Sequence, residues 1–182
     1  MAVKGLKVNS LNMSDDVSGL VLLNTTSFSA VSSQEITGIF SATYTQYRIV
    51  GNFIGGTTAT EVRGRFLSGT NTEYTGADHR MQTQTAENTT FSGTRFTGDT
   101  SFYNLTNVST DNETLFIMEF LNPFQTAKKS IFTTSAPVAS TTGIYTRITS
   151  HGTPTTTAFT GFKFIPVAST IAGSISVYAY NK

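Results

Sequence analysis

YTQYRIVGNFIGGTTATEVRGRFL, residues Tyr44–Leu67, is the stretch of sequence that decides the fold class. Its first half alternates between two sets of side chains that a β-strand places on opposite faces, namely Tyr47, Ile49 and Phe53 against Arg48, Val50 and Asn52. Its second half repeats the pattern, with Val62 and Phe66 on one face against Arg63 and Arg65. A period of two with one charged face indicates strands with one solvent-exposed face. The intervening Gly55 and Gly56 predict a hairpin turn that joins the two strands.

Short runs of the same kind recur from Leu20 onward, separated by turn residues. The predicted strands are 20–23, 27–31, 44–54, 58–67, 78–84, 91–96, 101–105, 114–121, 129–134, 143–150, 159–165 and 173–180. No long window shows a helical period, so helices do not alternate with these strands. We therefore expect an all-β chain, with an extended N-terminal arm over residues 1–19 and an antiparallel β-sandwich of jelly-roll type over residues 20–182.

One predicted strand, Thr114–Leu121 (TLFIMEFL), is apolar on both faces. Such a run is typical of a strand that is covered on both sides. We expect one of its two faces to contribute core residues, either Phe116, Met118 and Phe120 or their neighbours Leu115 and Ile117.

Composition narrows the function classes. Charged residues make up 13% of the chain, about half of the usual share. The net charge of +1 offers no basic surface for nucleic acid and no polybasic segment for an anionic membrane, so neither is an expected partner. The first ten residues lack the apolar region of a signal peptide. If the protein works outside a cell, release by cell lysis inside a virus particle is one route that agrees with this observation.

The search for catalytic chemistry centres on two histidines, His79 and His151. Asp78 and His79 are adjacent, so a strand would point them to opposite faces, where they cannot form a proton relay. We interpret both histidines as surface or loop residues. The chain has no cysteine and no metal-ligand spacing, nucleophile motif or phosphate-binding loop. We therefore expect a non-enzymatic protein with no catalytic residues, no cofactor and no metal.

Four segments, in order, resemble virion proteins of tailed bacteriophages. They are Ser27–Val50 (SFSAVSSQEITGIFSATYTQYRIV), Glu61–Gly69 (EVRGRFLSG), Phe120–Pro123 (FLNP) and the ending Gly161–Tyr180, in which Gly173, Val177 and Tyr178 match. The resemblance implies a jelly-roll module on the virion surface, either a head decoration (cement) protein or a tail-fibre tip. The chain shows no collagen-like repeat or coiled coil, which favours a compact decoration protein over a long fibre.

This resemblance implies a structural protein that binds other virion proteins, such as the major capsid or tail protein, and further copies of itself, most simply as a homotrimer. The alternative is a tail-fibre or receptor-binding module that recognises host cell-surface glycan. Tyrosines would then stack on sugar rings, and the candidates are Tyr44, Tyr74, Tyr103, Tyr145 and Tyr178. A glycan-cleaving enzyme is a third possibility, and its only support is that the acidic residues, although scattered in the sequence, could include a catalytic pair.

The arm over residues 1–19 has too few apolar residues to form a core of its own. It still carries apolar side chains at a nearly alternate spacing: Val3, Leu6, Val8, Leu11 and Met13. An extended arm with this pattern can add a strand to the edge of a partner's sheet and bury one row of side chains. We therefore expect these five residues to bind a partner, with a disordered tail as the alternative.

Overall fold

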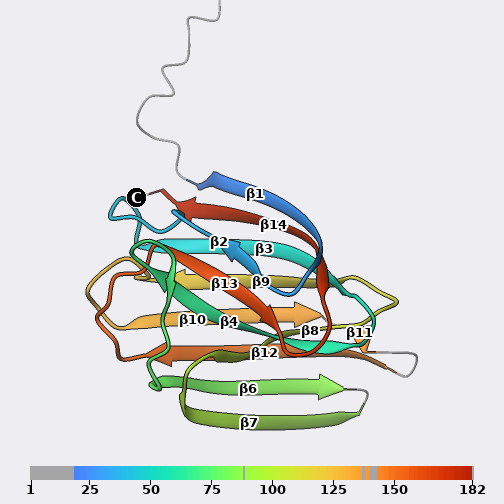
Figure 1. The fold of residues 1–182 in the computed structure, drawn as a ribbon. Coiled ribbons are helices and arrows are strands. Elements are labelled where there is room, and N and C mark those ends of the chain that lie inside the picture. The colour runs from blue at the N-terminus through green and yellow to red at the C-terminus, as the bar shows by residue number, and fades with distance from the viewer. Residues whose placement is uncertain (1–18, 88, 137, 140–142, 182) are drawn as a thin grey trace, which may run out of the picture.

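A computed structural model of the protein describes residues 19–87, 89–136, 138–139 and 143–181. Every regular element in these ranges is a strand, and the strands form two antiparallel sheets packed together (Figure 1). The all-β antiparallel sandwich that the sequence predicts is therefore confirmed. No helix of the described ranges could cross a membrane.

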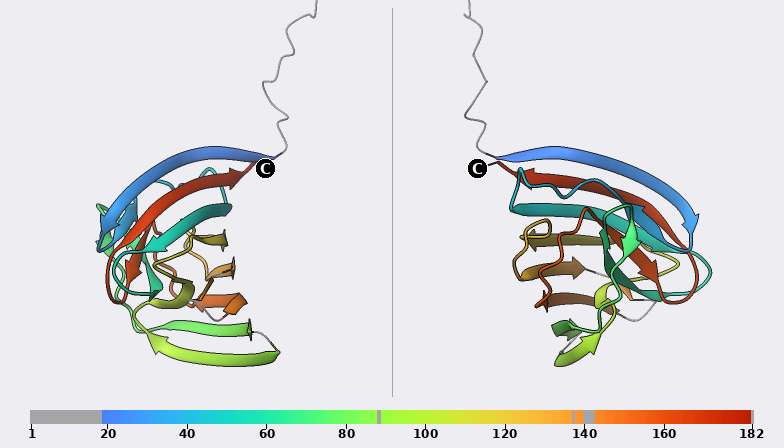
Figure 2. Two further views of the ribbon diagram at one scale, coloured as in Figure 1. Left: turned by 90° about the vertical axis from the view of Figure 1, so that its right-hand side faces the viewer. Right: turned by 60° about the vertical axis from the view of Figure 1, so that its left-hand side comes forward.

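The larger sheet has nine strands and bends along its width from β1 to β7 (Figure 2). Its order is β1 (Leu20–Val31), β14 (Ile171–Tyr180), β3 (Gln46–Gly55), β9 (Thr114–Leu121), β10 (Lys129–Ala136), β12 (Gly143–Thr153), β6 (His79–Glu87) and β7 (Thr90–Asp99), with β11 (Val138–Ala139) beside β12. The smaller sheet has the order β2 (Gln34–Ile36), β13 (Gly161–Pro166), β4 (Thr60–Ser68) and β5 (Thr72–Glu73), with β8 (Phe102–Val108) also paired to β4.

Aromatic side chains from both sheets fill the space between them. The rings of Phe66 and Phe159 stack with centroids 4.3 Å apart, and Phe53 of the larger sheet meets Phe164 of the smaller one at 5.3 Å. These rings are fully buried. Burial of apolar area of this kind is the main stabilising contribution to the fold.

Strand β9 buries only one of its two apolar faces. Phe116, Met118 and Phe120 are buried, whereas Leu115 and Leu121 are 53% and 46% exposed. The expectation of a strand covered on both sides is therefore wrong. The second apolar face of β9 belongs to the outer surface of the sandwich, on which no element of the described chain packs.

The predicted hairpin at Gly55 and Gly56 is also wrong, because β3 and β4 lie in different sheets. The backbone N–H groups of the turn bind other segments: Gly55 donates to the Ser109 carbonyl at 2.7 Å and Gly56 to the Thr170 carbonyl at 2.9 Å. Both strands carry one apolar row. Crossing between the sheets turns these rows toward the shared core, where both are buried.

Candidate functional site

Strand β7 forms a free edge of the larger sheet. It pairs with β6 on one side and with no strand of the described chain on the other. All of its residues except Asp99 are exposed, and Phe91 is 70% exposed. Free edges expose a row of backbone N–H and C=O groups that can pair with another strand, and natural proteins usually protect them with short strands, prolines or charges. Strand β7 has ten residues, no proline and a single mid-strand charge, Arg95.

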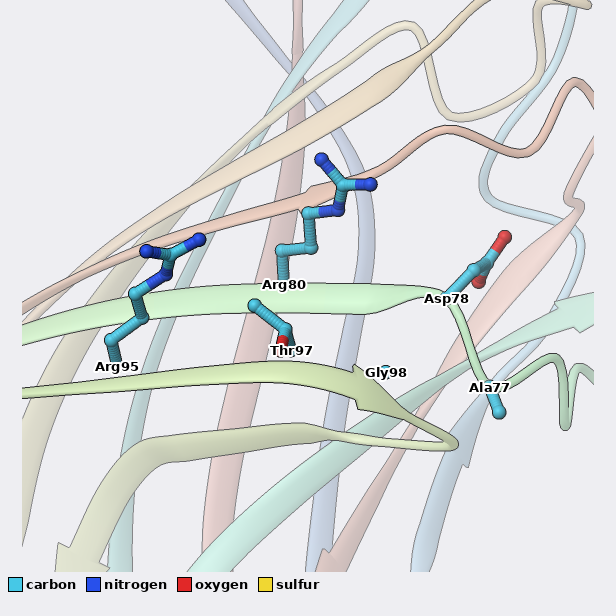
Figure 3. A pocket seen from close by; sticks show the side chains of 6 residues that line it. All are labelled: Ala77, Asp78, Arg80, Arg95, Thr97 and Gly98. Atoms are coloured by element: carbon cyan, nitrogen blue, oxygen red, sulfur yellow. The ribbon is translucent and has the colours of Figure 1, made fainter.

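An open pocket of about 490 Å³ lies beside this edge (Figure 3). It is lined by Ala77, Asp78, Arg80, Arg95, Thr97 and Gly98. Arg80 pairs with Thr97 in the β6–β7 register and Arg95 pairs with Gln82, so the two arginines are diagonal neighbours on one face. Their side chains extend in the same direction in Figure 3.

The two arginines have no acidic partner within the described ranges, where the ion pairs use other basic residues. The two carboxylates at this end of β6 and β7 already accept hydrogen bonds elsewhere. Asp78 accepts from the hydroxyls of Tyr74 and Thr153, each at 3.0 Å, and Asp99 accepts from two backbone N–H groups of the following turn. Two guanidinium groups on one face, without a counter-ion, suit a carboxylate or phosphate group from outside.

His79 and His151 are buried on the inner face of β6 and β12, with exposed fractions of 2% and 4%. The interpretation as surface or loop residues is therefore wrong. Their ring nitrogens have no hydrogen-bond partner among the described residues, and both rings pack against Phe102. Burial lowers the pKa of His79 to about 4 and that of His151 to about 3, so both rings are neutral at pH 7.

No group of three or more metal-ligating side chains occurs in the part of the chain that the structure describes. Several charged side chains instead form ion pairs on the outer face of the smaller sheet. The Lys163 ammonium contacts Glu35 at 3.0 Å and Glu73 at 2.7 Å, and Arg65 also contacts Glu73 at 2.6 Å. These two cations lower the pKa of Glu73. Such partly exposed pairs fix side-chain positions and add little stability.

Most of the tyrosines proposed for sugar stacking are engaged in packing. The guanidinium of Arg63 lies 3.8 Å from the ring centroid of Tyr103, Tyr44 packs edge-on against Tyr47, and Tyr74 packs against Phe159. Tyr178 lies on the outer face of β14, and the side chain of Tyr145 lies outside the described part. Among the described residues, the contacts of Tyr44, Tyr74 and Tyr103 therefore argue against a row of free rings for a glycan.

Arg80 and Arg95 are not among the site residues that the sequence predicts. A signal was present, because Arg80 and Gln82 alternate with His79 and Met81 along β6 and so share the outer face. The arm residues that the sequence analysis proposed for partner binding lie outside the described ranges: Val3, Leu6, Val8, Leu11 and Met13.

No protein-family model, curated protein or solved structure matches this chain.

Proposed function

We propose that this chain is a non-enzymatic structural protein of a bacteriophage particle, a capsid decoration or cement protein on the virion surface. One observation supports the proposal: the larger sheet has exposed apolar side chains on its outer face and a free strand edge. Its outer face exposes Leu22, Leu115, Leu121 and Ile148, and it ends in the free edge strand β7. Exposed apolar side chains and open strand edges are features of proteins that bind other proteins.

The strand order supports a jelly-roll connectivity, as the resemblance to virion proteins implies. Eight strands, in chain order β1, β2, β3, β4, β8, β9, β13 and β14, change sheet at each step except between β4 and β8, which both belong to the smaller sheet. They fall into the neighbouring sets β1-β14-β3-β9 and β2-β13-β4-β8. A double-sheet jelly roll has strand sets of this kind, which supports the proposed module, and β10, β12, β6 and β7 extend the first set.

In this role the protein binds the major capsid or tail protein and further copies of itself, with a homotrimer as the expected assembly. The arm over residues 1–19 attaches the module to a neighbouring protein of the particle. The chain has no cysteine and so forms no disulfide bonds. Its core holds a large set of buried aromatic rings, which can stabilise the sandwich on the outside of a particle.

Locating the chain in purified particles of the encoding phage tests the proposal. Quantitative mass spectrometry should find it at a copy number comparable to that of the major capsid protein, and electron cryomicroscopy should place it over the shell. A few copies confined to the tail would favour the adsorption module. Complete absence from mature particles would refute both roles.

The Arg80–Arg95 pocket favours one alternative, a receptor-binding module for an acidic host glycan. Its two unpaired guanidinium groups suit the carboxylate of a uronic acid or the phosphate of a bacterial surface polymer. Titration with such a polysaccharide, monitored by calorimetry, tests this alternative. Binding that disappears in Arg95→Gln and persists in Lys128→Gln would support it, whereas equal behaviour of the two variants would refute it.

A further inference from the structure

We propose that β7 accepts the N-terminal arm of a second copy of this chain as an added strand, with Asp15 of the arm beside Arg95. The proposal rests on the attachment role of the arm and names its partner: another copy of the same protein. Three independent features carry it, namely the free edge, the unpaired arginines and the reach of the arm.

The first feature is the shape of the β7 edge. Phe91, Gly93, Arg95 and Thr97 share the outer face, because they pair with Ala86, Gln84, Gln82 and Arg80 of β6. An added strand would place alternate side chains next to this row. Gly93 leaves space there for a larger neighbouring side chain, and Phe91 offers an exposed apolar ring.

The second feature is the match between this row and residues 11–17, LNMSDDV. When the arm runs parallel to β7, one register gives each of the four side chains in this row a matching neighbour on the arm. Leu11 lies beside Phe91, Met13 beside Gly93, Asp15 beside Arg95 and Val17 beside Thr97. Apolar side chains then meet the ring and the glycine, and a carboxylate meets the unpaired guanidinium.

The third feature is distance. A continuous row of paired residues crosses the larger sheet from Val21 on β1 to Phe96 on β7, over eight strands. Seven strand spacings of about 4.8 Å make this path about 34 Å long. Asp15 precedes Val21 by six residues, which reach at most about 22 Å when fully extended. The arm therefore cannot pair with β7 of its own chain along the sheet.

The chain leaves the sandwich at the edge opposite to β7. The backbone N–H of Asn181 donates to the carbonyl of Gly19 at 3.0 Å, which fixes the start of β1 beside the end of β14. Each copy thus has the start of β1 at one edge of the larger sheet and the acceptor strand β7 at the other (Figure 1). Head-to-tail contacts close into a ring when the rotation between successive copies allows it, and three copies related by such a rotation would make the proposed trimer.

The mass of the full chain in solution, measured by light scattering or sedimentation at micromolar concentration, tests this inference. The intact protein should be oligomeric, and Arg95→Glu should weaken its association roughly tenfold to a hundredfold, because a charge-assisted contact is lost. Lys128→Glu is the matched control, since this lysine is exposed and precedes β10, away from β7. It carries the same change in charge and should leave the mass unchanged.

A mixing experiment identifies the two halves of the contact. Asp15→Lys has an intact β7 and a defective arm, whereas Arg95→Glu has the reverse. The two variants should each associate weakly, and mixing them should raise the mass above that of either alone, because every contact between unlike copies joins opposite charges. The chain has no cysteine, so Met13→Cys together with Gly93→Cys should yield disulfide-linked oligomers only between chains.

Three outcomes would overturn the inference. One is a monomeric full chain. The second is an Arg95→Glu protein that folds and associates like Lys128→Glu. The third is an Arg95→Glu protein that keeps its mass and loses binding of an acidic polysaccharide, which would assign the pocket to glycan. All of these are solution measurements, so their failure is distinguishable from failure to find the protein on the phage shell.

Discussion

The stability of this protein should fall as the pH drops from 7 to 5, because two buried histidines must stay neutral in the folded state. Burial holds the pKa of His79 at about 4 and that of His151 at about 3, below the ordinary value of 6.5. The unfolded chain therefore binds more protons than the folded chain over this interval. Stability is fully present above pH 6.5 and is lost progressively as the pH falls toward 4.

The expected size of the effect follows from the same values. At pH 5 both rings are still neutral in the folded protein. In the unfolded chain their pKa of about 6.5 lies about 1.5 units above the solution pH, so both rings are protonated. Each histidine then costs about 2 kcal/mol, and the pair about 4 kcal/mol, relative to pH 8. For a domain of this size the change corresponds to a decrease in melting temperature of roughly 8–16 °C. Asp78 and Asp99 favour the charged form of His79, so His151 should dominate at the lowest pH.

Urea denaturation at pH 8, 7, 6 and 5 measures the effect. His151→Leu replaces the ring with an apolar side chain of similar volume whose environment includes Phe102. This variant should lose about half of the pH dependence, and His79→Leu combined with it should remove most of the rest. The reasoning is refuted if the wild-type protein is equally stable at pH 7 and pH 5, or if the double variant keeps the wild-type slope.

Three further predictions concern the core, the backbone and the surface. Phe116→Ala should destabilise the fold by about 3–5 kcal/mol in chemical denaturation, whereas Leu115→Ala, on the exposed face of the same strand, should cost less than about 1 kcal/mol. Gly173→Ala should lower the melting temperature strongly, because φ is +149° and a Cβ would lie 1.9 Å from a backbone oxygen; Gly93→Ala, with its nearest neighbour at 3.6 Å, should be nearly neutral. Lys163→Gln should cost about 1 kcal/mol or less, and equal losses in low and high salt would contradict an ionic origin.

The sequence identified the strands well because their alternation is local information. The run Thr114–Leu121 matches β9 residue for residue, and the faces assigned to Tyr47, Ile49 and Phe53 are the buried ones. Which strands pair is not local. A glycine pair between two amphipathic strands fits a hairpin and an inter-sheet crossing equally well. The choice depends on distant partners of the turn, the carbonyls of Ser109 and Thr170.

The candidate site was harder to predict for a related reason. Arg80 and Arg95 form a candidate site only because β6 and β7 pair in a register that puts both side chains on one face. His79 and His151 were misjudged because polar residues are usually exposed, and the sequence does not show that this part of the sandwich interior is polar. The alternation of His79 with Arg80 along β6 was the available signal.

One row of paired residues shows how the surroundings of the larger sheet change from its centre to the edge strand β7. From the centre of the larger sheet to its edge, the row contains Ile49, Met118, Thr133, Thr149, Thr83 and Thr94. The first five are buried, but their chemistry changes from apolar to hydroxyl as the row leaves the aromatic core, and Thr94 on β7 is exposed. The smaller sheet still covers the row at Thr149, whose hydroxyl donates to the Asn104 carbonyl of β8 at 3.2 Å. It does not cover Thr94, which is exposed. An edge strand without cover gains little by burial of its own side chains. Its length and free backbone groups are better explained if a further strand pairs with it, and this is the place that we propose for the arm of a second copy.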